Sequence, residues 1–213
     1  MFQDETLKNY EMGSKNTFFN RRLMVNGAAY FSQSENFQFF YVDLLNDRGQ
    51  VIDNIDEVNI KGLELELQGL VTNDFQVFGG IGVTDSEIKK FAIAPHQVGN
   101  HTPKNTLYTA NLGAQYGFHL GPMDATLRVD AERRGRKYWH PDNVESQDPL
   151  TLYNARFTLK KGDFQLVFWG KNLGNKKYYT DFNDIAYSGL PSGSDIGFPA
   201  QPRTFGVDVR YDF

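Results

Sequence analysis

The sequence predicts an all-β protein that forms part of an antiparallel transmembrane β-barrel. Three observations support this class. Apolar and polar residues alternate with a period of two along most of the chain, short and long connections alternate between these segments, and 15% of the 213 residues are aromatic. A tilted strand of about ten residues crosses a bilayer with only every second side chain apolar. The low mean hydropathy of −0.51 is therefore compatible with a membrane protein.

The clearest strand signal covers residues 63–67, where three leucines alternate with Glu64 and Glu66. A strand places the leucines on one face and the carboxylates on the other, whereas a helix would scatter the leucines around its axis. The same alternation recurs in eight further segments, of which the first is the weakest: residues 10–18, 23–31, 75–84, 108–116, 125–132, 153–160, 164–169 and 204–213. We therefore expect about nine strands, each of about ten residues.

Connections of two lengths alternate between these segments. Short ones lie near residues 20–21, 72–74, 121–122 and 161–163, and long ones near residues 46–56, 87–104, 136–149 and 172–201. Outer-membrane barrels have short turns on the periplasmic rim and long loops on the extracellular rim. The pattern thus predicts that the first and last strands both run from the loop rim to the turn rim.

The start of the chain and the strand count indicate a portion of a larger barrel. Residues 1–5 show neither a basic n-region nor an apolar h-region, so we expect no signal peptide here. A sheet that begins and ends with inward-running strands has two open edges, and each unsatisfied backbone group costs several kcal/mol in lipid. Residues 1–213 are therefore expected to be the C-terminal portion of a longer barrel.

Composition excludes several classes of function. The chain has no cysteine, which rules out disulfides, thiolate metal sites and a cysteine nucleophile. A net charge of −4 gives no reason to expect nucleic acid as a partner. The four histidines lack metal-ligand spacing, and the acidic residues near Asp53 lack the glycine of a calcium loop. We expect no metal and no cofactor.

The last predicted strand ends in a specific pattern. Apolar residues alternate through Tyr211 and the chain closes on Phe213. This ending resembles the signal read by the barrel-assembly machinery, which is an expected partner. An ordinary final strand that happens to end in phenylalanine is the alternative.

Five stretches carry a family resemblance. In order, they are YEMGSK at 10–15 with RLMVNGAAYF at 22–31, IKGLELE at 60–66, GNHTPK at 99–104 with YTANL at 108–112, GKNLGNKKYY at 170–179, and PRTFG at 202–206. Together they resemble the barrel of TonB-dependent receptors from the outer membrane of Gram-negative bacteria. The resemblance covers nearly the whole chain.

The resemblance implies a barrel of about 22 strands that is filled by an N-terminal plug. It implies active uptake rather than enzymatic activity, powered by contact between the plug and TonB. The plug and more than half of the strands are absent from this chain. A ferric siderophore or other iron chelate is the expected ligand, and cobalamin and oligosaccharides are alternatives that this family also carries.

Cationic and aromatic residues gather at two predicted extracellular strand ends. The first cluster also contains Lys137, and the second also contains Lys171 and Lys177. The candidate ligand contacts are Arg133, Arg134, Arg136, Tyr138, Trp139 and His140 in the first cluster, and Lys176, Tyr178 and Tyr179 in the second. Such side chains suit an anionic chelate through charge pairing, stacking and cation–π contact. The alternative is an interfacial girdle that contacts outer-membrane lipid and lipopolysaccharide phosphates, because basic and aromatic residues are enriched at this rim anyway.

Charges of both signs are predicted on the inward face. They are Arg128, Asp130, Glu132, Arg156, Lys160, Asp208, Arg210 and Asp212. These side chains are expected to pair across strands, and the family resemblance adds contact with the plug as a second role.

Three other classes of protein compete with a receptor. A passive porin would show similar alternation but not the ordered stretches. A barrel enzyme would need a nucleophile, for which Ser146 near His140 is a loose candidate without an elbow motif. A soluble all-β binding module would not separate its connections by length.

Overall fold

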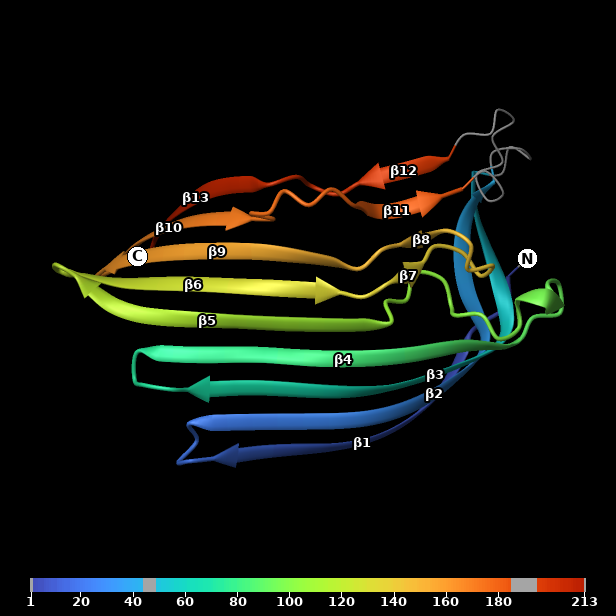
Figure 1. Cartoon of the computed structure of the whole chain (residues 1–213), viewed down its shortest axis with the longest axis horizontal. Coiled ribbons are helices and arrows are strands. Elements are labelled where there is room, and N and C mark those ends of the chain that lie inside the picture. Colours follow the sequence, from blue (N-terminus) through green and yellow to red (C-terminus); the bar gives the residue numbers. More distant parts are fainter. Residues whose placement is uncertain (1, 44–48, 185–194, 213) are drawn as a thin grey trace.

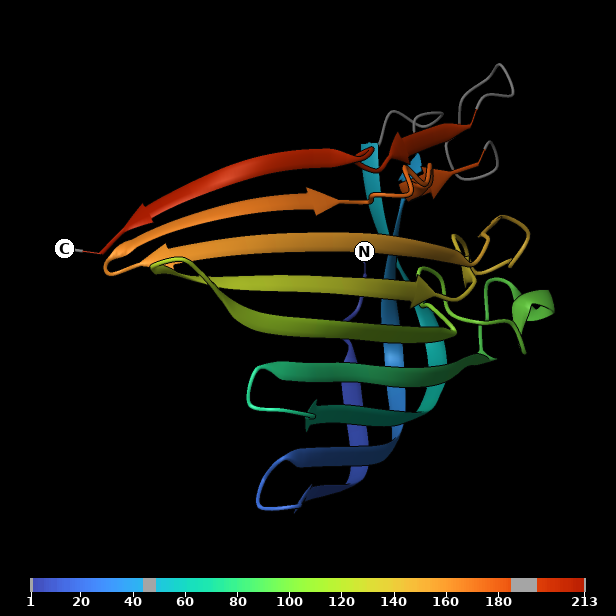
Figure 2. The ribbon, with the colours of Figure 1, turned by 60° about the vertical axis from the view of Figure 1, so that its left-hand side comes forward.

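Nine antiparallel strands form one continuous sheet in the computed structural model, which describes residues 2–43, 49–184 and 195–212. The strand order is β1-β2-β3-β4-β5-β6-β9-β10-β13. The bounds are β1 (Thr6–Phe18), β2 (Leu23–Asp43), β3 (Gly49–Leu70), β4 (Phe75–Lys90), β5 (Tyr108–Leu120), β6 (Met123–Arg134), β9 (Leu150–Lys161), β10 (Phe164–Lys171) and β13 (Thr204–Tyr211). The sheet curves like part of a barrel wall (Figures 1 and 2). The expected nine-strand antiparallel architecture is confirmed.

One face of the sheet is apolar across all nine strands. The register continues the apolar row from strand to strand: Phe157 lies opposite Leu127 on one side and Phe168 on the other, and Phe168 lies opposite Val207. Large side chains of this face remain exposed, including Leu112 at 69%. A contiguous apolar band of this extent needs an apolar partner, and a bilayer supplies one.

The opposite face is polar and carries the charged residues expected to point inward. A row of facing residues crosses five strands, namely Asn26, Glu66, Gly80, Asn111 and Glu132. Aromatic rings on this face cover glycines of the neighbouring strand, with Tyr30 over Gly62, Phe78 over Gly113 and Trp169 over Gly206, so that an added Cβ would collide with the ring. These rings fill the space that the glycines leave, as in sheets where aromatic residues rescue glycine positions.

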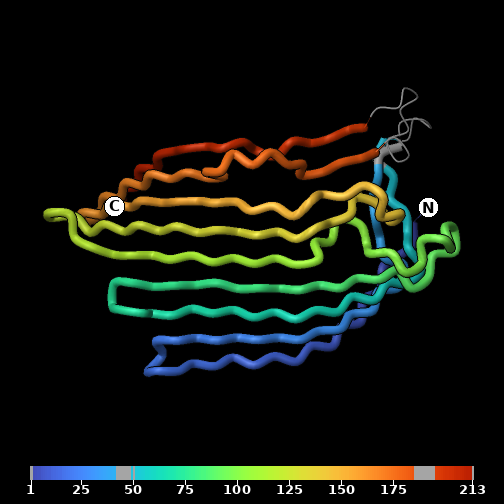
Figure 3. Tube along the Cα trace, in the orientation of Figure 1, coloured from blue at the N-terminus to red at the C-terminus, as the bar shows by residue number. Residues whose placement is uncertain are grey.

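The two rims differ as predicted. Short turns lie at one end of the sheet, and the long connections lie at the other (Figure 3). The turn between β1 and β2 uses left-handed backbone at Phe19, Asn20 and Arg21, while Gly121 and Gly162 supply positive φ angles in two other turns. The N-terminus lies at the loop rim and the C-terminus at the turn rim (Figure 1). Both outermost strands therefore run from the loop rim to the turn rim.

The expected loop at residues 46–56 is partly wrong, because residues 49–56 belong to β3. Strands β2 and β3 have 21 and 22 residues, about twice the expected length. Beyond the sheet their hairpin bends and crosses toward β11 (Tyr179–Asn183) and β12 (Ile196–Pro199) (Figures 1 and 2). It is held by a small core in which Phe39, Ile55 and Val58 pack against Ile88 and Phe91.

The other long connections also contain short elements. The connection at 87–104 holds the end of β4 and the 3₁₀ helix η1 (Pro95–Gln97), and the connection at 136–149 holds the pair β7 (Lys137–Tyr138) and β8 (Ser146–Gln147). In the described part of the chain, no helix is long and apolar enough to span a membrane. Of the expected assembly signal, Tyr211 lies opposite Phe164 and is exposed with the apolar face, whereas Phe213 lies outside the described residues.

The two faces predict different tolerance to charge. Leu65 lies in the middle of the apolar stretch of β3, between Leu63 and Leu67, so we expect Leu65→Arg to destabilise the protein in lipid vesicles by about 2–4 kcal/mol. Asn26→Arg is the matched control, because Asn26 lies on the polar face opposite Glu66. Urea unfolding in vesicles measures both. Equal destabilisation by the two variants would contradict the assignment of the faces.

The contact between Trp169 and Gly206 predicts a second difference. We expect Gly206→Ala to cost about 1–3 kcal/mol, since the new methyl group overpacks against the indole ring. Gly117→Ala is the control, because its Cβ would lie 3.8 Å from the nearest atom, the Asp74 carbonyl oxygen. The same unfolding measurement compares the two variants. If Gly206→Ala were as stable as the wild type, the packing of Trp169 would not require a glycine at position 206.

Candidate functional site

The loops at the extracellular rim are joined to one another by hydrogen bonds and ring contacts. The Lys104 amide donates to the Tyr138 carbonyl at 2.6 Å, and the His101 and Tyr138 rings stack with centroids 5.7 Å apart. Trp139 packs against Phe182 of β11, with centroids 6.1 Å apart. Three connections that are distant in sequence thus form one surface above the sheet.

A cavity of about 310 Å³ lies where these loops meet the sheet, and we call it the rim pocket. It is lined by Lys104, Thr106, Thr109, Arg134, Gly135, Lys137, Gln147, Leu150, Tyr178, Tyr179 and Thr180. Thr109 and Arg134 are opposite each other on the polar face. The rim pocket therefore lies on the lumen side of the wall, just above the membrane-spanning sheet.

Two of its three cations are neutralised by carboxylates. Lys104 Nζ lies 2.9 Å from Asp181, and Arg134 Nε lies 2.6 Å from Glu132. Lys137 has no carboxylate within ion-pair distance among the described residues. Its ammonium lies 3.5 Å from the Thr180 carbonyl oxygen and 4.1 Å from the centre of the Trp139 ring.

Lys137 is therefore a partly buried cation that forms no ion pair among the described residues. Burial lowers the pKa of Lys137, and Arg134 and Lys104 lower it further, while Asp181 acts in the opposite direction. An anion that entered the rim pocket would supply the missing charge, and charge-assisted hydrogen bonds are among the stronger polar contacts. Tyr178 and Tyr179 add aromatic surface to the same wall.

The structure separates the residues predicted to contact ligand. Arg134, Tyr178 and Tyr179 come together in the rim pocket. Arg133 lies on the other face, in the row of the apolar residues, where it donates to the Tyr108 hydroxyl at 3.3 Å and to Thr151 at 3.1 Å. This position fits the alternative of a lipid-facing girdle better than it fits a ligand contact.

Arg136 and Lys176 lie outside the rim pocket. Arg136 is exposed and forms an ion pair with Asp148 at 3.3 Å. Lys176 is exposed in the turn after β10, where its amide donates to the Asn172 side chain at 2.8 Å. Both side chains are free to reach solvent, and contact with ligand stays a prediction for them.

Trp139 and His140 lie in the interior of the loops. Trp139 is 3% exposed and His140 is 1% exposed. Burial lowers the pKa of His140, while Asp184 and Asp142 act in the opposite direction. Their side chains support the rim from within. Contact between a ligand and either side chain would require the loops to open, and it stays a prediction.

Sequence reasoning placed Lys137 in the first basic cluster but not among the candidate contacts, and it left Lys104 and Asp181 out altogether. The basic and aromatic composition around Lys137 was therefore a usable signal. Lys104 and Asp181 are 77 positions apart and lie in different connections. No local pattern brings them together, because only the folded loops do so.

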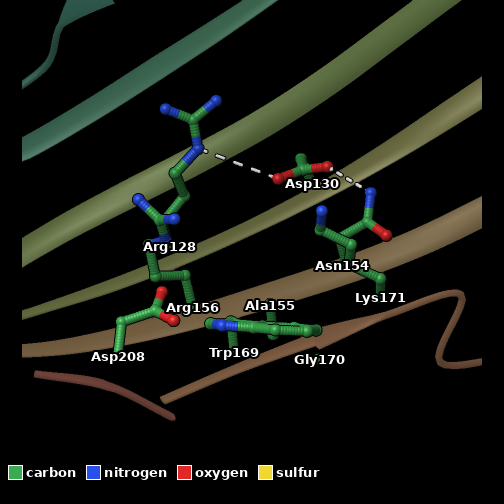
Figure 4. Close-up of a pocket in the computed structure, with 9 residues that line it drawn as sticks. All are labelled: Arg128, Asp130, Asn154, Ala155, Arg156, Trp169, Gly170, Lys171 and Asp208. Atoms are coloured by element: carbon green, nitrogen blue, oxygen red, sulfur yellow. Dashed lines mark hydrogen bonds and ion pairs between the residues drawn. The ribbon is translucent and has the colours of Figure 1, made fainter. Parts of the chain in front are cut away.

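A second hollow of about 500 Å³ lies lower on the lumen face (Figure 4). Its charged lining is mixed: Arg128 Nε lies 3.7 Å from Asp130, whose other oxygen accepts a 2.8 Å hydrogen bond from Asn154. Trp169 lies flat on its floor, beside Arg156. The ion pair therefore lies within β6, and only the hydrogen bond from Asn154 crosses to β9, so the expected pairing of opposite charges across strands is not seen in this hollow. The near balance of charges gives this hollow no clear ligand preference.

Comparisons with known proteins agree with this architecture. A family model described as "TonB dependent receptor-like, beta-barrel" matches residues 2–173. The ferric-pyoverdine 358 receptor of Pseudomonas putida is 34% identical over 219 residues, which cover 98% of this chain and 24% of the receptor. The chain thus spans about a quarter of the length of this relative.

Solved structures show the same fold at low identity. The ferric yersiniabactin uptake receptor of Yersinia pestis matches with a TM-score of 0.81 and 18% identity, over 100% of this chain and 30% of that one. The siderophore receptor PiuA of Acinetobacter baumannii matches with a TM-score of 0.73 and 20% identity, over 96% of this chain and 28% of that one. Because the family model covers most of the sequence and the Pseudomonas relative is 34% identical, the chain belongs to the TonB-dependent receptor family, as part of its outer-membrane β-barrel.

Proposed function

We propose that residues 1–213 are the C-terminal portion of a TonB-dependent receptor that takes up a ferric siderophore or a similar iron chelate. The observation that carries the proposal is the unmatched Lys137 cation beside Tyr178 and Tyr179 in the rim pocket, on the lumen side of the extracellular rim. An anionic chelate with aromatic or planar groups fits such a surface. The names of the relatives support the same ligand class.

The rest of the barrel belongs to this proposal. Along one edge of β1 and one edge of β13, the described residues contain no ladder partner. Further strands that satisfy these edges, an N-terminal plug and energisation by TonB complete the proposed receptor. The barrel-assembly machinery and lipopolysaccharide are its proposed partners in assembly and in the membrane. None of the relatives named above is a porin, a cobalamin receptor or an oligosaccharide receptor.

Uptake by a deletion strain tests the proposed ligand class. We expect a strain without the gene to lose growth on one ferric chelate as the sole iron source, and to regain it when the full-length gene is returned. Radioactive iron uptake should stop when the proton gradient is collapsed. Unchanged growth on every iron chelate tested, or uptake that persists without the gradient, would contradict the proposal.

The rim pocket predicts a specific role for Lys137. We expect Lys137→Gln to weaken binding of that ferric chelate about tenfold or more, because a charge-assisted contact contributes about 1.5–3 kcal/mol. Since the pKa of Lys137 is lowered, wild-type affinity should fall as pH rises through that pKa, at a lower pH than for an ordinary lysine. Lys137→Gln should lack this dependence.

Arg136→Gln is the matched control, because Arg136 is a neighbouring cation that lies outside the rim pocket and pairs with Asp148. Titration calorimetry on the purified full-length receptor measures both variants. Equal loss of affinity in the two would show that the pocket contributes only general positive charge.

A further inference from the structure

Lys104 is the point where three separate parts of the rim meet. Its ammonium lies 2.9 Å from each carboxylate oxygen of Asp181 in β11. The same ammonium lies 3.9 Å from the centre of the Phe40 ring in β2. The lysine and the carboxylate are largely shielded, at 26% and 30% exposure.

This junction links elements that the sheet does not join. In the part of the chain that the structure describes, β2 and β3 share no backbone ladder with β11 or β12. The β2–β3 hairpin nevertheless reaches across the rim toward β11 and β12 (Figures 1 and 2). Through Lys104, Phe40 on the hairpin and Asp181 on β11 are held against one ammonium group.

The backbone at Lys104 is itself unusual. Its φ angle is +60°, in the left-handed region that few residues other than glycine adopt. The short hydrogen bond from its amide to Tyr138 holds this conformation. Strained residues of this kind persist where surrounding structure fixes them, and they are enriched at ligand clamps and switches.

Lys104 also lines the rim pocket together with Lys137. An anion that pairs with Lys137 there enters the space that the Lys104 ammonium borders. The ammonium can form only a limited number of strong contacts, so a second anionic oxygen competes directly with Asp181. A lysine ammonium on a flexible stem can turn between two such partners.

We propose that the Lys104–Asp181–Phe40 junction is a ligand-responsive latch: an anionic oxygen group in the rim pocket draws Lys104 away from Asp181 and Phe40, and so releases the β2–β3 hairpin from β11. This inference rests on the proposed function for the ligand class, but the latch itself is defined by contacts of this chain alone. Ligand occupancy would thereby change how the hairpin covers the rim.

Hydrogen exchange measured by mass spectrometry on the full-length receptor tests the latch, with pyrophosphate as a simple anionic probe. We expect Lys104→Gln, without any anion, to increase amide exchange about fivefold in peptides that contain residues 37–43 and 179–183, as loss of an ion pair of about 1 kcal/mol implies. Saturating pyrophosphate should produce the same change in the wild type. Lys89→Gln is the control, because Lys89 pairs with Glu87 on β4 and lies outside the junction.

The Asp181→Asn variant tests whether an anion competes with Asp181 for Lys104, or whether Asp181 only supports the fold of the rim. Removing the competing carboxylate should strengthen pyrophosphate binding about fivefold, whereas a residue that merely supports the fold would weaken it. Unchanged exchange in Lys104→Gln, or failure of pyrophosphate to bind either the wild type or Asp181→Asn, would overturn the latch. Those outcomes are independent of growth on iron chelates, which tests the ligand class separately.

Discussion

Backbone hydrogen bonding in a medium without water is the constraint on which this structure depends. In the hydrocarbon core, each N–H and C=O group must find a partner within the protein. The continuous antiparallel ladder from β1 to β13 supplies those partners and fixes the register of every strand pair. Because side chains alternate with a period of two, that register aligns Leu63 with Val83 on one face and Glu64 with Gly82 on the other. A slip of one residue would exchange the two faces.

Above the membrane this constraint ends, and the backbone becomes irregular where function is expected. The rim is built from short strand pairs, a 3₁₀ turn and a hairpin that leaves the sheet. Buried rings such as Trp139 fill its interior, while Lys137 and Lys104 bring partly buried positive charge to its lumen side. In many proteins a regular scaffold positions irregular loops, and the loops bind the ligand. The sheet and the rim of this chain fit that arrangement.

All nine membrane strands could be predicted from the sequence, because a sheet with one apolar and one polar face leaves a period-two alternation that a helix does not produce. The upper parts of β2 and β3 could not, since Asn36 adopts a φ of +56° and the strand beyond it packs Phe39 into a local core. These contacts depend on how the loops pack against one another and not on which side chains face lipid. The basic and aromatic composition located Arg134, Tyr178 and Tyr179 in the rim. The ion pair between Lys104 and Asp181 could not be predicted, because the two residues are 77 positions apart in the sequence.

Site-directed fluorescence labelling of β5 tests the central claim most directly, because the chain has no native cysteine. Single cysteines at 112, 114 and 116 lie on the apolar face, and those at 111, 115 and 117 lie on the polar face. A bimane label on each position, in the receptor reconstituted with brominated lipid, reports contact with acyl chains. The structure predicts strong quenching at the three even positions and weak quenching at the three odd ones. Equal quenching in both sets, or the reverse order, would contradict the assignment of this chain as a lipid-facing barrel wall.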